Sequence, residues 1–161
     1  MPEMRSRPAT DADVAIVASW IRSPRDCEFW AGPDFPFPAS LETFVEKLRV
    51  QSTTSVCLVE EAVVAFGQLA DKGDGRAHLG KIIVAPMARR KGYGQQLVRE
   101  LLRVAADRGF RIVGLNAQIE NEVAIRMYKA LGFEFTERPS HLTPAPEAHY
   151  MTYNLNRQAT P

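Results

Sequence analysis

This chain of 161 residues has no long apolar segment, few cysteines and almost no net charge. No apolar run approaches the roughly 20 residues that a membrane-spanning helix needs, so we expect no transmembrane helix and no membrane partner. The first residues, Met1 to Arg5, are not followed by an apolar core, so we expect no secretory signal peptide. Together these absences predict a cytoplasmic protein.

Cysteine is scarce, since only Cys27 and Cys57 are present, with no CxxC spacing and no paired histidines. We therefore expect two free thiols in a reducing compartment and no metal site. Lysine and arginine together number 20 and aspartate and glutamate 19, which gives a formal net charge of +1. Nucleic-acid-binding domains normally carry a marked basic excess, so this balance argues against a nucleic-acid partner.

Apolar residues make up 45% of the chain, enough for the core of one domain. Hydrophobic periodicity predicts early helices, then a meander of strands, then an alternation of strands and helices. The expected strands cover residues 4–8, 55–59, 62–70, 77–84, 111–117, 133–136 and 149–155. The expected helices follow Thr10, Ser40 and Gly94 and cover 122–131, and a structured loop rich in aromatic residues is expected over 27–38.

These elements predict one α/β domain over residues 1–155, followed by a frayed tail over 156–161. We expect a central mixed, mostly antiparallel sheet with helices on both faces. The strands at 77–84 and 111–117 are joined by a helix, so they form the expected parallel pair.

The most informative segment is 81–94, where a β-branched strand enters a basic turn that opens an amphipathic helix. Free backbone N–H groups and the helix dipole favour a bound phosphate at such a turn. A P-loop needs Gly-Lys before Ser or Thr, but Tyr93 follows Gly92. A dinucleotide-binding turn needs a third glycine where Leu97 stands. Neither of these two motifs fits.

What remains is Arg89-x-x-Gly92-x-Gly94 between a strand and a helix. This pattern resembles the pyrophosphate loop of the GNAT (general-control-related N-acetyltransferase) superfamily. The second segment that resembles the family runs Asn121-x-x-Ala124-x-x-x-Tyr128 and then Leu131-Gly132-Phe133. The two segments occur in the family's order, which makes the resemblance far more specific than either motif alone.

The resemblance implies a GNAT-like domain that transfers an acetyl group from acetyl-CoA to a primary amine by direct attack. The implied pantetheine-binding strand positions are Ile82, Ile83 and Val84, where a bulge leaves a backbone N–H for the thioester oxygen. The implied pyrophosphate cradle consists of Arg89, Arg90, Lys91, Gly92, Tyr93 and Gly94. No metal cofactor is implied.

Two downstream residues have both a functional and a structural interpretation. Asn121 matches a cofactor contact of the family, and it is equally suited to cap the helix that follows. Tyr128 matches the general acid that protonates the departing thiolate, because a phenol with a pKa of about 10 keeps its proton at neutral pH. The alternative for Tyr128 is a core position on its helix.

The general base is the point at which this chain departs from the family. Members carry a glutamate at the position of His78 or at that of Asn116, and this chain has neither glutamate. His78 is either the base, directly or through water, or a partly exposed strand histidine. A histidine pKa of about 6.5 suits an α-amine near 7.7–8.0 better than a lysine amine near 10.4, so we expect a low-pKa acceptor.

In the family the acceptor enters opposite the cofactor, here between residues 26–37 and 139–146. The aromatic residues of the first segment either wall a pocket or close the core, and its acids either attract an amine or face water. These residues are Trp30, Phe35, Phe37, Asp26, Glu28 and Asp34. The acceptor itself is unidentified, and the chain is expected to be a monomer or a homodimer. The alternative function is a non-catalytic module that binds acyl-CoA.

Overall fold

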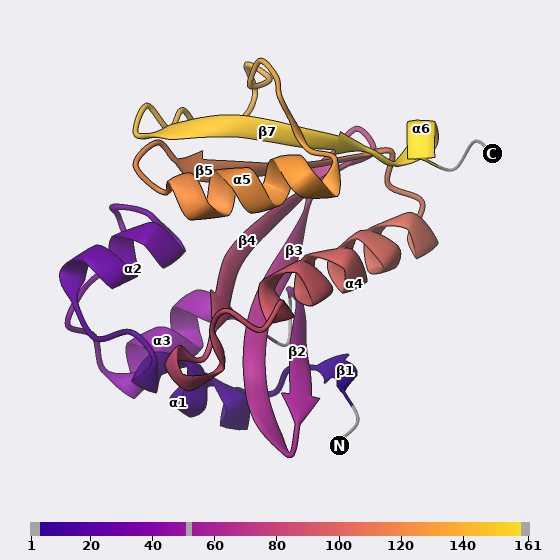
Figure 1. Ribbon diagram of the computed structural model, residues 1–161. Helices are drawn as coiled ribbons and strands as arrows, with labels where there is room; N and C mark the ends of the chain where they lie inside the picture. Colours follow the sequence, from indigo (N-terminus) through magenta and orange to yellow (C-terminus); the bar gives the residue numbers. More distant parts are fainter. Residues whose placement is uncertain (1–3, 51–52, 159–161) are drawn as a thin grey trace.

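The computed structural model describes residues 4–50 and 53–158, which form a seven-stranded sheet with helices on both faces (Figure 1). The strands are β1 (Arg5–Pro8), β2 (Thr54–Glu60), β3 (Ala62–Gly73), β4 (Arg76–Val84), β5 (Ile112–Gln118), β6 (Glu134–Phe135) and β7 (Ala148–Asn154). The helices are α1 (Asp11–Ser19), α2 (Pro24–Ala31), α3 (Leu41–Leu48), α4 (Tyr93–Asp107), α5 (Glu122–Leu131) and α6 (Leu155–Gln158).

The strand order across the sheet is β1-β2-β3-β4-β5-β7-β6. Every neighbouring pair is antiparallel except β4 and β5, which are parallel and are connected through α4. The predicted α/β fold with a mixed, mostly antiparallel sheet is therefore confirmed.

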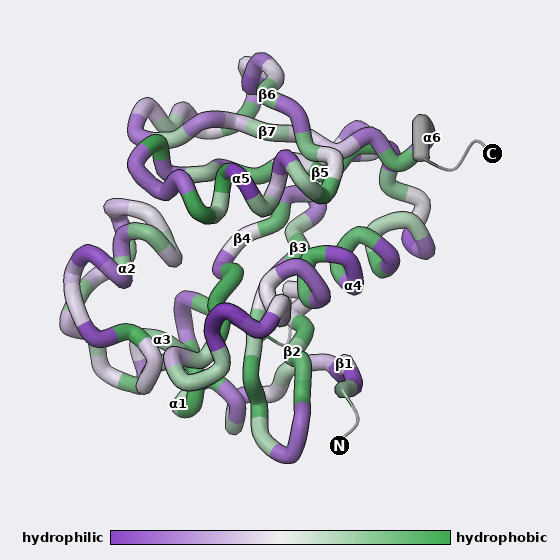
Figure 2. Tube along the Cα trace, in the orientation of Figure 1, coloured by the Kyte–Doolittle hydropathy of each residue, from purple (hydrophilic) through white to green (hydrophobic). Residues whose placement is uncertain are grey.

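Side chains that alternate along the strands divide the core into two layers. On β2, Val56 and Leu58 pack toward α4 and α5, whereas Cys57 and Val59 pack toward α1, α2 and α3. This alternation is the geometry of a strand that is buried on both faces. Figure 2 shows hydrophobic residues along β2 and hydrophilic residues at the tight β2–β3 turn.

The aromatic segment expected to be a loop over 27–38 begins as a helix instead. Ser23 accepts a hydrogen bond from the Asp26 N–H at 3.0 Å, and Pro24 occupies the first helical position of α2. Proline is favourable there because the first turn of a helix does not need its N–H. The Ser23-Pro24 pair therefore starts a second helix, and the loop begins only at Gly32.

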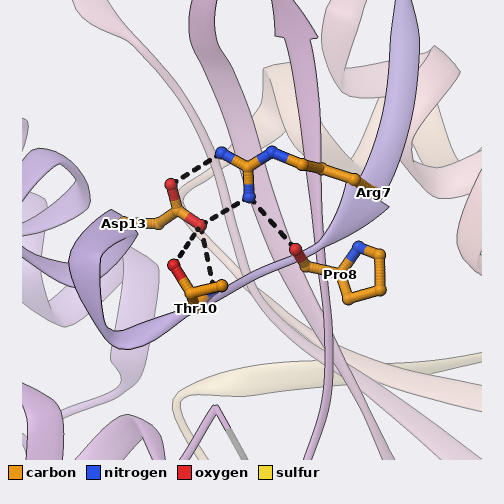
Figure 3. Close-up of polar contacts among 4 residues, drawn as sticks. All are labelled: Arg7, Pro8, Thr10 and Asp13. Atoms are coloured by element: carbon orange, nitrogen blue, oxygen red, sulfur yellow. Dashed lines mark hydrogen bonds and ion pairs between the residues drawn. The ribbon is translucent and has the colours of Figure 1, made fainter.

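A bidentate ion pair joins β1 to the start of α1 (Figure 3). The Arg7 guanidinium donates to the two carboxylate oxygens of Asp13 at 2.7 and 2.8 Å, and Thr10 donates its N–H to the same carboxylate at 2.8 Å. The hydrogen bond from Arg7 is the main cause that lowers the pKa of Asp13 to about 2. The Asp13 side chain is only 5% exposed, so this pair fixes the entry of α1.

The remaining expectations concern the thiols and the C-terminus. Cys27 and Cys57 are buried free thiols, as predicted, and burial raises the pKa of Cys57 to about 12. The tail expected to fray from residue 156 starts with the helical turn α6, and residues 159–161 lie outside the described part. No helix within residues 4–50 and 53–158 is long and apolar enough to cross a membrane.

Candidate active site

The parallel strands β4 and β5 separate near the middle of the sheet. They are paired only between Arg76–Leu79 and Ile112–Leu115, after which β4 continues with β3 and β5 continues with β7. The separated strand ends, the start of α4 and the inner side of α5 enclose a cavity of about 780 Å³. This volume lies in the usual range for small-molecule sites, about 300–1,000 Å³.

A β-bulge interrupts β4 at the cavity wall. Phe66 is paired with Ile83 and Gln68 with Gly80, so the single residue Gly67 opposes both Lys81 and Ile82. Lys81 has a φ of 57°, a left-handed backbone conformation that is unusual for a residue with a side chain. The bulge takes backbone groups out of the regular ladder at the position where the resemblance implies an oxyanion donor.

Two contacts keep the bulge in place. The indole N–H of Trp30 in α2 donates to the Lys81 carbonyl at 2.9 Å. On the other strand, a Cβ on Gly67 would lie 2.6 Å from Cδ1 of Ile82, so the absence of a side chain at Gly67 lets Ile82 keep its present position across β3. Sequence reasoning missed this role of Trp30, because the residues that form the hydrogen bond are 51 positions apart.

The basic turn after β4 lines the cavity where the chain enters α4. Arg90 has a φ of 67° and Gly92 a φ of 84°, and α4 then begins at Tyr93 without a side-chain cap. Gly92, Tyr93, Gly94 and Gln95 all line the cavity. Figure 2 shows the hydrophilic residues of the turn beside the start of α4. Unpaired N–H groups in a left-handed turn at a helix start form an anion-binding concavity.

Glycine at position 94 allows α4 to start close to its neighbours. A Cβ there would lie 3.3 Å from the Met127 sulfur and 3.7 Å from Cγ2 of Val84. The Tyr93 hydroxyl donates to the Glu60 carboxylate, which ties the first turn of α4 to the end of β2. The cradle is thus held from β2 on one side and α5 on the other.

The far wall of the cavity comes from α5. Asn121 accepts a hydrogen bond from the Ala124 N–H at 3.3 Å, so it caps the helix, and it also lines the cavity. Tyr128 lines the cavity with 8% of its surface exposed, and its ring packs edge-on against Phe133. Burial raises the pKa of Tyr128 to about 12, so the phenol stays protonated at neutral pH.

The structure does not bring His78 to this cavity. Its neighbours Ala77 and Leu79 pack under α4 and α5, so alternation turns His78 to the other face of the sheet, and His78 is not among the residues that line the cavity. Burial, with help from nearby cations, lowers the pKa of His78 to about 4. Asn116, the other position where the family carries a glutamate, lines the cavity and accepts a hydrogen bond from Arg138 at 2.6 Å.

The cavity is also lined by Trp20, Asp26 and Phe29 from the N-terminal helical segment, and this part of its wall is called the acceptor end below. Of the aromatic residues that were candidates for a pocket wall, Trp30 and Phe35 pack against Phe44 in the core instead. Phe37 also packs against that core cluster. Glu28 and Asp34 are exposed and do not line the cavity, so Asp26 is the one acid of the segment that does.

A bulged strand, an uncapped helix start and a buried tyrosine around one cavity agree with the resemblance drawn from the sequence. The model of the acetyltransferase (GNAT) family matches residues 17–133. The chain belongs to this family. Acetyl transfer to an amine is therefore the activity that family membership assigns to it.

Similarity to individual proteins varies in extent. Over 126 residues the chain is 35% identical to aminoglycoside N(6')-acetyltransferase type 1 of Salmonella enteritidis, covering 69% of this chain and 87% of that protein. Over 61 residues it is 43% identical to an uncharacterised N-acetyltransferase of Methanocaldococcus jannaschii, a match that spans 38% of this chain but 27% of that relative's length. The PaiA N-acetyltransferase of Thermoplasma acidophilum, solved with coenzyme A, shares the fold with a TM-score of 0.69, at 16% identity over 94% of this chain and 99% of that chain.

The described residues hold no group of three or more His, Cys, Asp or Glu side chains that could bind a metal ion.

Proposed function

We propose that this protein transfers an acetyl group from acetyl-CoA to a primary amine of a small molecule or a peptide. The observation that carries the proposal is the single cavity that joins the β4 bulge, the uncapped start of α4 and Tyr128. A module that only binds acyl-CoA would need none of the proton-donating chemistry at Tyr128, and no observation favours that alternative.

The residues present fit acetyl-CoA. The N–H groups of residues 92–95 and the side chains of Arg89, Arg90 and Lys91 would hold the pyrophosphate. The edge of β4 from Ile82 to Val84 faces the cavity beyond the last β4–β5 pair, so its backbone would bind the pantetheine arm. When bound, acetyl-CoA supplies an activated thioester carbonyl.

The chain's own groups then have distinct tasks. The bulge at Lys81 and Ile82 directs a backbone N–H at the oxygen that becomes negative when the amine nitrogen attacks. As the carbon–sulfur bond breaks, Tyr128 donates its hydroxyl hydrogen to the sulfur. The phenol is protonated before the reaction because burial keeps its pKa well above 7.

The proton that the amine loses needs an acceptor, and the geometry favours Asp26 over His78. Asp26 is the one carboxylate among the described residues that line the cavity. Its charge would attract the ammonium form of the acceptor and then receive its proton, directly or through water. His78, by contrast, is not among the residues that line the cavity.

The decisive experiment measures thiol release from acetyl-CoA across a panel of amines. The panel includes amino acids, peptides and polycationic amines, the last because the Salmonella relative is named for aminoglycosides. Tyr128→Phe should lower kcat by about 10²–10⁴-fold, the usual contribution of a general acid, while the Kd for acetyl-CoA stays the same.

Tyr153→Phe is the matched control. Tyr128 and Tyr153 both pack against Phe133, with ring centroids 5.6 and 5.4 Å from that of Phe133. Only Tyr128 lines the cavity, so Tyr153→Phe should leave kcat unchanged. Thiol release that survives in Tyr128→Phe would exclude the acid role, and acetyl-CoA binding without turnover on any amine would favour the non-catalytic alternative.

A further inference from the structure

Four basic side chains lie near one another, and we call them the basic cluster: Lys72, His78, Lys81 and Arg138. Ala70 of β3 is paired with His78 of β4, and Lys72 follows two residues later, at an irregularity in the β3–β4 register. The charges of Lys72, Lys81 and Arg138 all act on His78. These residues come from β3, from β4 and from the segment after β6.

The basic cluster has no carboxylate partner within the described part of the chain. Arg7, Arg25 and Arg103 each form an ion pair with an acid, whereas none of the three cations of the cluster does. Burial and the charge of Lys72 lower the pKa of Lys81. Like charges held together at a half-buried position destabilise the free protein, and such arrangements concentrate at functional sites.

Two members of the cluster have donors available at the cavity. Lys81 lines it directly. Arg138 donates one hydrogen bond to Asn116, which also lines the cavity, and its guanidinium stacks 5.4 Å above the Tyr150 ring. A guanidinium has five N–H donors, so most of them are left for a ligand, and the two contacts hold the group in one orientation.

We propose that the acceptor amine carries an anionic oxygen group, a carboxylate or a phosphate, that Lys81 and Arg138 bind while the amine faces Asp26. This inference rests on the proposed acetyltransferase function and names its substrate class. A small molecule that carries both an amine and a carboxylate, such as an amino acid, fits this arrangement. Its carboxylate would bind Lys81 and Arg138, and its ammonium group would face Asp26. Polycationic amines are disfavoured, because the basic cluster repels them.

Matched pairs of acceptors test the inference. Each amino acid is compared with its carboxamide, phosphoethanolamine is compared with ethanolamine, and spermidine serves as the polycation. The anionic member of at least one pair should have a kcat/KM higher by about tenfold or more, the usual effect of a charge-assisted hydrogen bond. The pair that shows the preference distinguishes carboxylate from phosphate recognition.

Substitutions within the basic cluster test whether it causes the preference for anionic acceptors. Arg138→Gln should abolish it, chiefly by raising KM for the anionic member while kcat for the uncharged member is kept. Lys81→Gln should abolish the preference as well, and it is judged by the ratio of kcat/KM within each pair alone, because Lys81 also lies in the bulge. Arg99→Gln makes the same change of charge on the exposed side of α4 and should leave the preference intact. A preference that persists in both cluster variants would overturn the assignment.

A binding measurement separates this inference from the proposed function. N-acetylated amino acids and their amides are titrated calorimetrically into the protein saturated with coenzyme A, and the phosphate arm uses N-acetylphosphoethanolamine and N-acetylethanolamine. Anionic compounds should bind about tenfold more tightly, and Arg138→Gln should remove the difference.

Equal binding of anionic and uncharged compounds overturns the inference. Acetyl transfer to amines without a preference for anionic ones leaves the acetyltransferase function standing. Absence of thiol release with every amine contradicts the function, and the titration still decides the inference.

Discussion

Replacing Trp30 with phenylalanine tests whether α2 holds the bulge in β4. Phenylalanine keeps an aromatic ring beside Phe35 and Phe44 but lacks the N–H that donates to the Lys81 carbonyl at 2.9 Å. A buried carbonyl left without a partner costs about 1–3 kcal/mol. The left-handed backbone of Lys81 costs about 1–2 kcal/mol, so this hydrogen bond is strong enough to offset the strain of the bulge.

We expect Trp30→Phe to lower the free energy of unfolding by about 1–3 kcal/mol, measured by urea denaturation. The bulge N–H should then be misplaced, and kcat on an uncharged amine should fall by about tenfold to a hundredfold, less than complete removal of an oxyanion donor. The Kd for acetyl-CoA should stay within about twofold, because the turn at residues 89–94 is untouched. Phe35→Leu is the control, since it disturbs the same aromatic cluster but keeps the hydrogen bond.

The same positioning role predicts a rescue. Glycine adopts a positive φ without steric penalty, so Lys81→Gly should preserve the bulge when the indole N–H is absent. Trp30→Phe should therefore reduce kcat less in the Lys81→Gly background than in the wild-type background, with an uncharged amine as acceptor. Equal losses in the two backgrounds, or a wild-type kcat in Trp30→Phe alone, would refute the reasoning.

Two further predictions concern the cradle and the stability of the fold. Gly92→Ala and Gly109→Ala introduce a side chain at nearly identical φ angles of 84° and 83°, with open space around both, so each should destabilise by about 1 kcal/mol. Only Gly92→Ala should raise the Kd for acetyl-CoA, and an equal effect of Gly109→Ala would contradict the assignment of the cradle. Asp13 has a pKa of about 2 in the folded state against an ordinary 3.8, which corresponds to about 2 kcal/mol of stability at 1.36 kcal/mol per pKa unit. That stability is fully present above about pH 4 and is lost as the pH falls toward 2; Asp13→Asn should flatten this dependence in urea titrations, and an unchanged slope would exclude the ion pair as its source.

Features of the fold that depend on local sequence were predictable. Helix α5 covers the same residues in the prediction and in the structure, because Asn121 caps its start and Gly132 adopts a left-handed conformation at its end. Helix α2 was missed, since Gly32 and the three prolines of residues 27–38 favour a loop, whereas Pro24 and Gly32 are the first position and the C-cap of a short helix. The same residue types mark both the boundaries of helices and the loops between them.

Features that depend on contacts across the sheet were not predictable from sequence spacing. The end of β4–β5 pairing at Leu79 creates the cavity, and no local pattern marks that point. His78 lies one residue before that end. The side of the sheet that it faces is set by Ala77 and Leu79, which pack into the core on the other side. The hydrogen bond from Trp30 to Lys81 and the approach of Arg138 to Asn116 both join residues that are distant in the chain.

The positive charge around the cavity offers a physical reason why this chain can lack the family's glutamate. Arg89 and Arg90 of the basic turn and Lys81 of the basic cluster all line the cavity. Cations that lower the pKa of His78 would also lower that of an ammonium group bound near them, since a nearby positive charge disfavours the protonated form in both cases. The same positive charge repels an ammonium group that approaches the cavity. An acceptor whose anionic group neutralises part of the basic cluster would enter in spite of this repulsion, whereas an acceptor without such a group would not. If Asp26 receives the proton as proposed, the protein's own field assists it, because the positive charge contributes to deprotonating the amine and stabilises the oxyanion that its attack creates.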